Sequence, residues 1–217
     1  MIHYSNREIA AKLRLYLATD DALFAGREPV KQIIRAVEGG VTAVQLRLKS
    51  TPDTVAYETG RHLLEVLRPL GVPLIINDRV DIMLALNADG VHVGRGDLPL
   101  PEVRKLAGPK IVGYSANSVQ DIHLAERQGA NYAGVGPIFA TDTKADTGPV
   151  LGLDGLAEIV KASPLPCVAI GGISQANIGS VAATGVVGCC VISAILRTAD
   201  PFKAAADLKK KLPARLE

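Results

Sequence analysis

The chain has 217 residues, of which 48% are hydrophobic and 21% are charged, with 21 glycines and 13 prolines. This composition excludes a disordered or fibrous protein, and the length suits one α/β domain with a sizeable core. The formal net charge of +2 gives no reason to expect nucleic acid or an anionic membrane as a partner, so any anion must be bound by a local cluster.

Short apolar runs alternate with helical patterns along the chain. The runs predict strands at residues 15–19, 43–47, 73–77, 90–93, 111–115, 132–135, 166–170 and 188–192. Several runs are apolar throughout, as expected for parallel strands that are buried on both faces. Helices are predicted between them, among others at residues 29–38, 54–70, 119–128, 153–161, 176–183 and 202–211.

Eight strand–helix units in 217 residues predict one (β/α)₈ barrel, a TIM barrel, that spans residues 1–217. A doubly wound open sheet is the alternative fold, but eight units favour closure. Glycines are expected to end several of the helices: Gly39 and Gly40, Gly71, Gly129 and Gly185.

Basic side chains end the second predicted strand. Barrel enzymes carry their chemistry at the C-terminal ends of the strands. In "VQLRLK", Gln45, Arg47 and Lys49 lie on one side of an extended segment. An Arg fork with a nearby Lys suits a phosphate, although simple solvation of both charges is an equally good interpretation.

Acidic side chains follow the next two strands. Asn77 and Asp78 come directly after the third strand, and Asp97 follows the fourth. Capping of the next helix is the competing role for one of Asn77 and Asp78, and for Asp97. Two aspartates beside basic residues suit Mg²⁺, which takes one or two carboxylates and keeps phosphate oxygens and water as further ligands.

Ser115 ends the fifth predicted strand, where it can bond a ligand or cap the next helix. It has no sequence partner that would make it a nucleophile. The four histidines lie in no elbow-like context and have no metal-ligand spacing, so we reject a Ser-His-Asp hydrolase and a histidine metal site. His92, within the fourth strand, is expected to be structural.

Polar and glycine-rich loops follow the last three strands. The sixth strand breaks at Gly136-Pro137 into "IFATDTKAD", which is either a solvated connection or an anion-binding loop. Gly171 and Gly172, in "AIGGISQAN", let backbone N–H groups approach a phosphate, although a tight turn without a ligand is the alternative. Ser193 lies at the matching level after the eighth strand. We therefore predict a basic anion site with a metal near strands 2 to 4 and a second anion site near strands 7 and 8.

The N-terminal segment and the cysteines indicate the cellular compartment. No apolar run approaches the roughly 18 to 20 residues that span a bilayer. Charged residues from Arg7 and Glu8 onward interrupt the N-terminal segment, which lacks the apolar core of a signal peptide. Cys167, Cys189 and Cys190 each lie within an apolar stretch, which is typical of small buried residues in a reducing compartment. We therefore expect a cytoplasmic protein.

The chain resembles the thiamine-phosphate synthase family in an ordered series of motifs: "LYLATD", "VQLRLKS", "IINDRVDIMLALNADGVHVGRGDLP", "VGYSANS", "ANYAGVGPIFATDTKAD", "VAIGGIS" and "VISAIL". The resemblance extends over nearly the whole chain, and the combination is specific. It implies a (β/α)₈ barrel that joins a hydroxymethylpyrimidine diphosphate to a thiazole phosphate. Such an enzyme releases diphosphate, yields thiamine monophosphate and requires Mg²⁺.

The resemblance also implies a role for each matching residue. The pyrimidine diphosphate would be held by Gln45, Arg47, Lys49, Asn77, Ser115 and Lys144. The thiazole phosphate would be held by Thr141, Thr143, Gly172, Ile192 and Ser193, with Gly171 added on geometric grounds. Mg²⁺ would be held by Asp78 and Asp97. Those expected to act in catalysis are Arg47, Lys49, Ser115 and Lys144.

Two positions depart from the family pattern. Asn117 stands where the family usually has histidine, and Arg95 stands where it usually has glutamine. A similar thiazole tautomerase relies on a histidine at the position of Asn117 and lacks both the Thr-x-Thr-Lys loop and the Asn-Asp pair. A tautomerase and a non-catalytic phosphate sensor are the alternatives. The expected partners are the two phosphorylated small molecules, without nucleic acid or membrane, and self-association into a homo-oligomer is left open.

Overall fold

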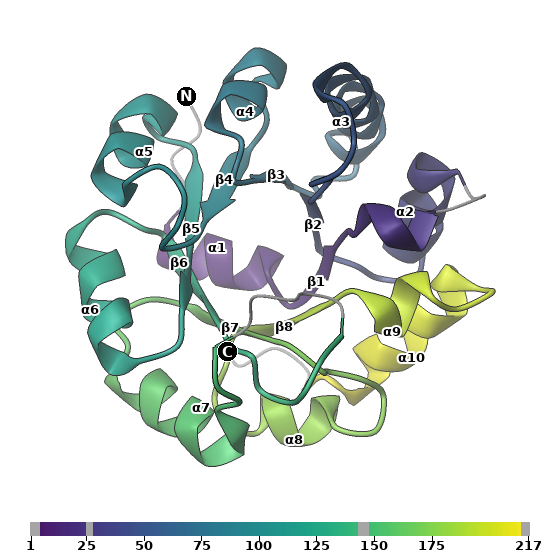
Figure 1. The fold of residues 1–217 in the computed structure, drawn as a ribbon. Helices are drawn as coiled ribbons and strands as arrows, with labels where there is room; N and C mark the ends of the chain where they lie inside the picture. Colours follow the sequence, from purple (N-terminus) through teal and green to yellow (C-terminus); the bar gives the residue numbers. More distant parts are fainter. Residues whose placement is uncertain (1–4, 25–27, 143–147, 214–217) are drawn as a thin grey trace.

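The computed structural model describes residues 5–24, 28–142 and 148–213. In these ranges, parallel strands form a closed barrel with helices around it (Figure 1). The strands are β1 (Leu15–Ala18), β2 (Ala43–Leu46), β3 (Leu74–Asn77), β4 (Gly90–Val93), β5 (Ile111–Ala116), β6 (Tyr132–Val135), β7 (Cys167–Ile170) and β8 (Gly188–Val191). Because β1 pairs with both β2 and β8, the sheet has no edge. The predicted (β/α)₈ barrel is therefore confirmed, and the open sheet is wrong.

Helices precede, connect and follow the strands. They are α1 (Asn6–Lys12), α2 (Pro29–Glu38), α3 (Asp53–Leu67), α4 (Val80–Leu86), α5 (Leu100–Ala107), α6 (Val119–Arg127), α7 (Gly152–Ala162), α8 (Ile178–Ala182), α9 (Ser193–Leu196) and α10 (Pro201–Lys211), with a 3₁₀ turn, η1 (Asp21–Phe24), after β1. Helices α2 to α8 connect successive strands in the outer layer, α9 and α10 follow β8, and α1 precedes β1. Left-handed residues follow several helices, as predicted: Gly40, Gly71, Gly129 and Gly185. Asn87, with φ 50°, ends α4 in the same way.

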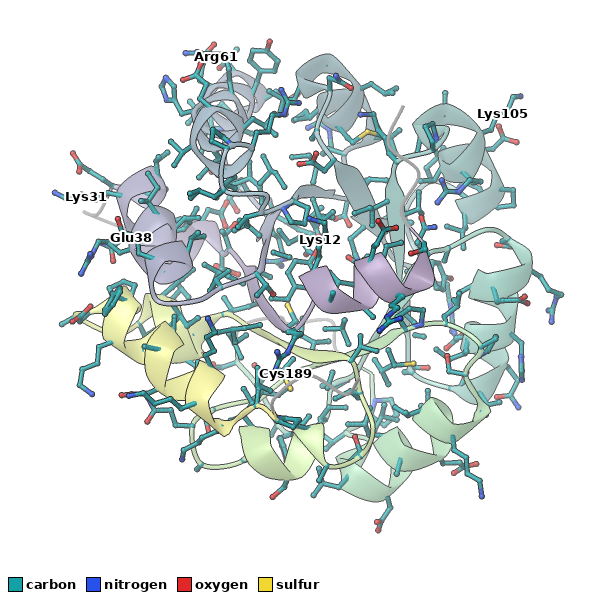
Figure 2. All side chains as sticks on the ribbon, turned by 180° about the vertical axis from the view of Figure 1, so that it is seen from behind. Lys12, Lys31, Glu38, Arg61, Lys105 and Cys189 are labelled. Atoms are coloured by element: carbon teal, nitrogen blue, oxygen red, sulfur yellow. The ribbon has the colours of Figure 1, made fainter. Side chains whose placement is uncertain are left out.

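The N-terminal end of the barrel is closed by α1. Its residue Ile9 and the following Leu13 are buried and pack with strand residues of the barrel interior, among them Ile75. Ser5 begins the helix with a capping box, since its hydroxyl accepts from the Glu8 backbone N–H and the Glu8 carboxylate accepts from the Ser5 N–H. Figure 2 shows α1 lying across this end of the barrel. The interior therefore opens at the other end, beyond the C-terminal ends of the strands.

The remaining expectations about burial agree with the structure. Cys167, Cys189 and Cys190 are free thiols and are buried, as predicted. Burial raises the pKa of the Cys189 thiol to about 12. Among the described helices, none combines the length and the apolar character needed to cross a membrane.

Candidate active site

A cavity with a volume of about 670 Å³ lies at the C-terminal ends of the strands. Its lining contains most of the residues predicted from the sequence: Gln45, Arg47, Lys49, Asn77, Asp97, Ser115, Thr141, Gly171, Gly172, Ile192 and Ser193. Asp78 lies next to this lining, because its carboxylate contacts Lys49. Thr143 and Lys144 lie outside the described residues. The fold thus brings residues from distant loops to one place.

The Arg47 guanidinium is held by a buried ion pair. Its Nη1 lies 2.5 Å from Asp20 Oδ2, and the two side chains are only 15% and 10% exposed. The Thr19 hydroxyl fixes the backbone of the same residue, since it accepts from the Arg47 N–H (2.8 Å) and donates to the Arg47 carbonyl (3.1 Å). Thr19 and Asp20, which we did not predict, follow β1 and lie outside the cavity lining. Thr19 and Asp20 therefore hold Arg47 in place without bordering the cavity themselves.

Lys49 and two aspartates form a charged cluster at the next loops. Lys49 Nζ lies 2.9 Å from Asp78 Oδ2, and the Asp97 Oδ2 accepts the Gly94 N–H at 2.7 Å. Burial alone would raise the pKa of Asp78, but the ion pair with Lys49 and a hydrogen bond with Asp97 outweigh it, so the pKa lies below its usual value. Burial, together with the neighbouring Asp78, raises the pKa of Asp97.

This carboxylate pair fits a divalent cation. Two adjoining carboxylates repel each other when both are ionised, and the raised pKa of Asp97 reflects that cost together with burial. A bound divalent cation would offset the repulsion between the two carboxylates. In residues 5–24, 28–142 and 148–213, no group of three or more His, Cys, Asp or Glu side chains could hold a metal ion. A Mg²⁺ ion here would thus take one or two protein carboxylates and complete its coordination with water and substrate oxygens.

The alternative of helix capping is wrong for Asn77, Asp78, Asp97 and Ser115. The N-cap positions of α4, α5 and α6 are taken by other residues, namely Arg79, Pro99 and Ser118. Asp78 instead has a left-handed backbone, with φ 60°, at the exit of β3. A positive φ is uncommon for residues other than glycine. Such residues cluster at functional sites, and Asp78 lies next to the cavity lining.

A chain of buried polar side chains forms the floor of the cavity. The Gln45 amide donates to the Tyr16 hydroxyl (3.0 Å), which lies 3.0 Å from the Tyr132 hydroxyl. The Tyr132 hydroxyl lies 2.9 Å from His92 Nδ1, and His92 Nε2 lies 3.0 Å from Ser115 Oγ. His92, which we expected to be structural, therefore lines the cavity and contacts a predicted site residue.

The glycine pair after β7 is required by the backbone. Gly171 has φ 100° and Gly172 has φ 65°, which disfavour any side chain. A Cβ atom on Gly171 would lie 2.7 Å from Pro137 Cα, because the loop after β6 packs directly on this turn. The Phe139 N–H donates to the Gly171 carbonyl at 3.1 Å. The pair is therefore a tight turn, and it also borders the cavity.

The two departures from the family pattern meet at one carboxylate. Arg95 Nη2 lies 2.7 Å from Asp121 Oδ1, and the Asn117 N–H donates to Asp121 Oδ2 at 3.1 Å. All three residues line the cavity. The Arg95 side chain is 75% exposed, so this cation faces the solvent at the mouth.

The family model described as thiamine monophosphate synthase matches residues 15–195. The chain belongs to the thiamine monophosphate synthase family. The thiamine-phosphate synthase of Desulfitobacterium hafniense (strain Y51) is 49% identical to it over 201 residues, which cover 92% of this chain and 97% of that protein. The thiamine-phosphate synthase of Syntrophomonas wolfei is 47% identical over 187 residues, which cover 86% and 90%. The resemblance inferred from the motifs is thus confirmed, and the protein is a transferase enzyme.

Solved structures agree with this assignment. The thiamine phosphate pyrophosphorylase from Pyrococcus furiosus superposes with a TM-score of 0.86 and 39% identity, covering 94% of this chain and 96% of that one. A 3-hexulose-6-phosphate synthase has a TM-score of 0.71 with 20% identity over 93% of this chain and 100% of that one. At such low identity the second match shows a shared barrel fold alone.

Proposed function

We propose that the chain joins a hydroxymethylpyrimidine diphosphate to a thiazole phosphate, which releases diphosphate and yields thiamine monophosphate. The observation that carries this proposal is the pairing of two kinds of anion-binding groups in one cavity. Arg47 and Lys49 line one part of the cavity, and Gly172 and Ser193 line another. Two substrates that each carry phosphate need two such regions. Membership of the family supports the same reaction.

The diphosphate fits the region around Arg47. A guanidinium donates parallel hydrogen bonds to phosphate oxygens. Among the described residues, Asp20 is the partner of the Arg47 guanidinium, whose remaining N–H groups are left for a ligand. Because the ion pair fixes the side chain before substrate arrives, little conformational entropy is lost on binding. Lys49 adds a point charge beside it.

Asp78 and Asp97 would hold the Mg²⁺ ion. When bound, the ion neutralises charge on the diphosphate as it leaves. Lys49, which pairs with Asp78, would bind the oxygens of the leaving group.

The reaction is a substitution at the CH₂ group of the pyrimidine. The bond from this carbon to the diphosphate oxygen breaks first, and its electron pair leaves with the diphosphate. The resulting cation is stabilised by the electron-rich aminopyrimidine ring. The thiazole nitrogen then donates its lone pair to the carbon and forms the new bond. This path needs no protein nucleophile, so catalysis comes from positioning and from electrostatic stabilisation of the leaving group.

An assay with both substrates, with and without Mg²⁺, tests the proposal. We expect thiamine monophosphate and diphosphate to form in equal amounts, and only when Mg²⁺ is present. Isomerisation of the thiazole phosphate alone would identify a tautomerase instead. Binding of the substrates without release of diphosphate would identify a sensor. Either result overturns the proposal.

A further inference from the structure

The interior of this barrel contains an unusual set of buried polar side chains. Barrel interiors are filled mainly by branched apolar residues. Here Tyr16, Gln45, His92 and Tyr132 are all 8% exposed or less, and all four line the cavity. Burying polar groups costs free energy unless each finds a partner, so such a layer indicates a role beyond packing. The substitution chemistry described above does not use the two tyrosines or the histidine.

The four side chains and Ser115 come from five strands and form one unbroken chain of hydrogen bonds. Each contact is between 2.9 and 3.0 Å, a normal length for such bonds. The chain begins at Gln45 on β2, passes through Tyr16 and Tyr132, and reaches His92. It ends at Ser115. Of the five residues, Ser115 and Gln45 are the two that we expected to bind substrate.

The donor at the Gln45 end sets the direction of the whole chain. An amide nitrogen can only donate, so the Tyr16 oxygen accepts from Gln45, and Tyr132 is the partner that can take the Tyr16 proton. In the same direction, the Tyr132 hydroxyl donates to Nδ1 of His92, and a neutral ring then carries its proton on Nε2, facing Ser115 Oγ. Burial raises the pKa of both tyrosines, so both keep the protons that this direction needs.

The hydroxyl proton of Ser115 is then the end of the chain. Ser115 Oγ accepts from His92 and must direct its own proton elsewhere. Ser115 lines the cavity beside the acidic pair, since a Cβ atom on Gly94 would lie 3.5 Å from Asp97 Oδ2 and 3.8 Å from Ser115 Oγ.

We propose that this chain is a directional hydrogen-bond relay in which His92 and Tyr132 are positioning residues that present the Ser115 hydroxyl as a donor to an acceptor atom of the pyrimidine diphosphate. The identity of that ligand rests on the proposed function. The direction of the relay does not, because it follows from the protein groups alone.

The tautomer of His92 tests the direction in the unmodified chain. The sequence contains four histidines, and the variant His92→Gln identifies the signals of His92 in a ¹H–¹⁵N spectrum that reports on the ring nitrogens. We expect a neutral ring with its proton on Nε2 and an unprotonated Nδ1. A proton on Nδ1, or a mixture of the two tautomers, overturns the relay. This result is decisive even if the protein makes no thiamine monophosphate, so the two proposals can fail separately.

A double-mutant cycle tests the function of the relay. Tyr132→Phe removes one hydroxyl and should lower kcat/KM for the pyrimidine diphosphate by about tenfold, the usual size of one lost hydrogen bond of this kind. The same change in a Ser115→Ala background should cost nothing more, because the relay then has no end point. Equal losses in both backgrounds would show that Tyr132 acts on packing and would overturn the proposal.

A matched variant controls for the loss of a tyrosine hydroxyl. Tyr57 on α3 lies outside the lining of the cavity, so Tyr57→Phe should leave kcat/KM unchanged. Tyr16→Phe removes a hydroxyl one step further from Ser115 and should cost less than Tyr132→Phe. Thermal unfolding of each variant separates a loss of folded protein from a loss of orientation. A larger effect for Tyr16→Phe than for Tyr132→Phe contradicts the order of the relay.

Discussion

Two Arg–Asp pairs border the same cavity and differ in their surroundings. Arg47 and Asp20 lie 2.5 Å apart with side chains 15% and 10% exposed, whereas Arg95 and Asp121 lie 2.7 Å apart with side chains 75% and 10% exposed. The distances are similar, but water screens only the second pair strongly. Burial therefore makes Arg47 a fixed part of the site, while Arg95 is a tethered surface cation.

The largest effect should come from the buried cation itself. We expect Arg47→Ala to lower the turnover rate by about 100- to 1000-fold, as for the loss of one preorganised charge partner of the leaving group. The Lys144→Ala variant is expected to lose activity on the same scale. Steady-state formation of thiamine monophosphate measures both. Arg61, which pairs with Glu58 and Glu65 at the periphery of α3 (Figure 2), supplies the control, since Arg61→Ala should be neutral. Near-normal turnover of Arg47→Ala contradicts the assignment.

The second largest effect should follow loss of the Asp20 carboxylate, the buried anion that pairs with Arg47. Asp20→Asn removes the charge that holds Arg47, and breaking a buried pair from one side costs about 3 kcal/mol of stability. We expect a lower free energy of unfolding in urea and a higher KM for the pyrimidine diphosphate, with the KM for the thiazole phosphate unchanged. In an Arg47→Ala background the same change should have little further effect on KM. Independent effects on KM would mean that Asp20 does not act through Arg47.

The pair with the exposed cation, Arg95 and Asp121, should matter much less. Because exposed ion pairs contribute about 0 to 1 kcal/mol, Arg95→Gln should change kcat/KM by less than about fivefold and leave the midpoint of thermal unfolding nearly unchanged. This variant also introduces the glutamine that the family resemblance leads us to expect at this position. A loss comparable to that of Arg47→Ala would remove the distinction between the two pairs.

The smallest expected effect is a difference between the two ion pairs in how much salt weakens their coupling energy. At 1 M NaCl the Debye length is about 3 Å, so any coupling between Arg95 and Asp121 should disappear. The coupling between Arg47 and Asp20 should persist, because water and ions reach it poorly. Double-mutant cycles of unfolding at low and high salt give both coupling energies. Equal sensitivity to salt would contradict the difference in burial.

The apolar runs were enough to predict the strands. The run at residues 15–19 became β1, Leu15–Ala18, and the run at 90–93 matched β4 without change. Parallel strands buried on both faces have a strong local signal, and glycines end helices for local steric reasons. Helix α1 was not predicted, although the capping box of Ser5 and Glu8 is a local signal for it; its contact with the barrel end could not be read from the sequence. That end exists only after the barrel has closed.

The candidate site was predictable only in part. Residues directly after strands, such as Arg47 and Asp78, could be found because the fold places all strand ends together. Asp20 and Tyr132 could not be found in this way. Asp20 acts on a residue 27 positions away, and the Tyr132 hydroxyl meets that of Tyr16 116 positions away. From the sequence alone, a tyrosine within an apolar strand cannot be distinguished from an ordinary core residue, because its hydrogen-bond partners are not known.

Closure of the barrel by α1 has a consequence for the order of events. With Ile9 and Leu13 buried in the opposite end, the cavity has its opening at the C-terminal ends of the strands. Under the proposed function, both substrates would enter by this opening, and both products would leave by it. We expect the pyrimidine diphosphate, placed at the floor beside Ser115, to bind before the thiazole phosphate. The expected kinetics are an ordered addition, in which the first substrate to bind competes with the last product to leave.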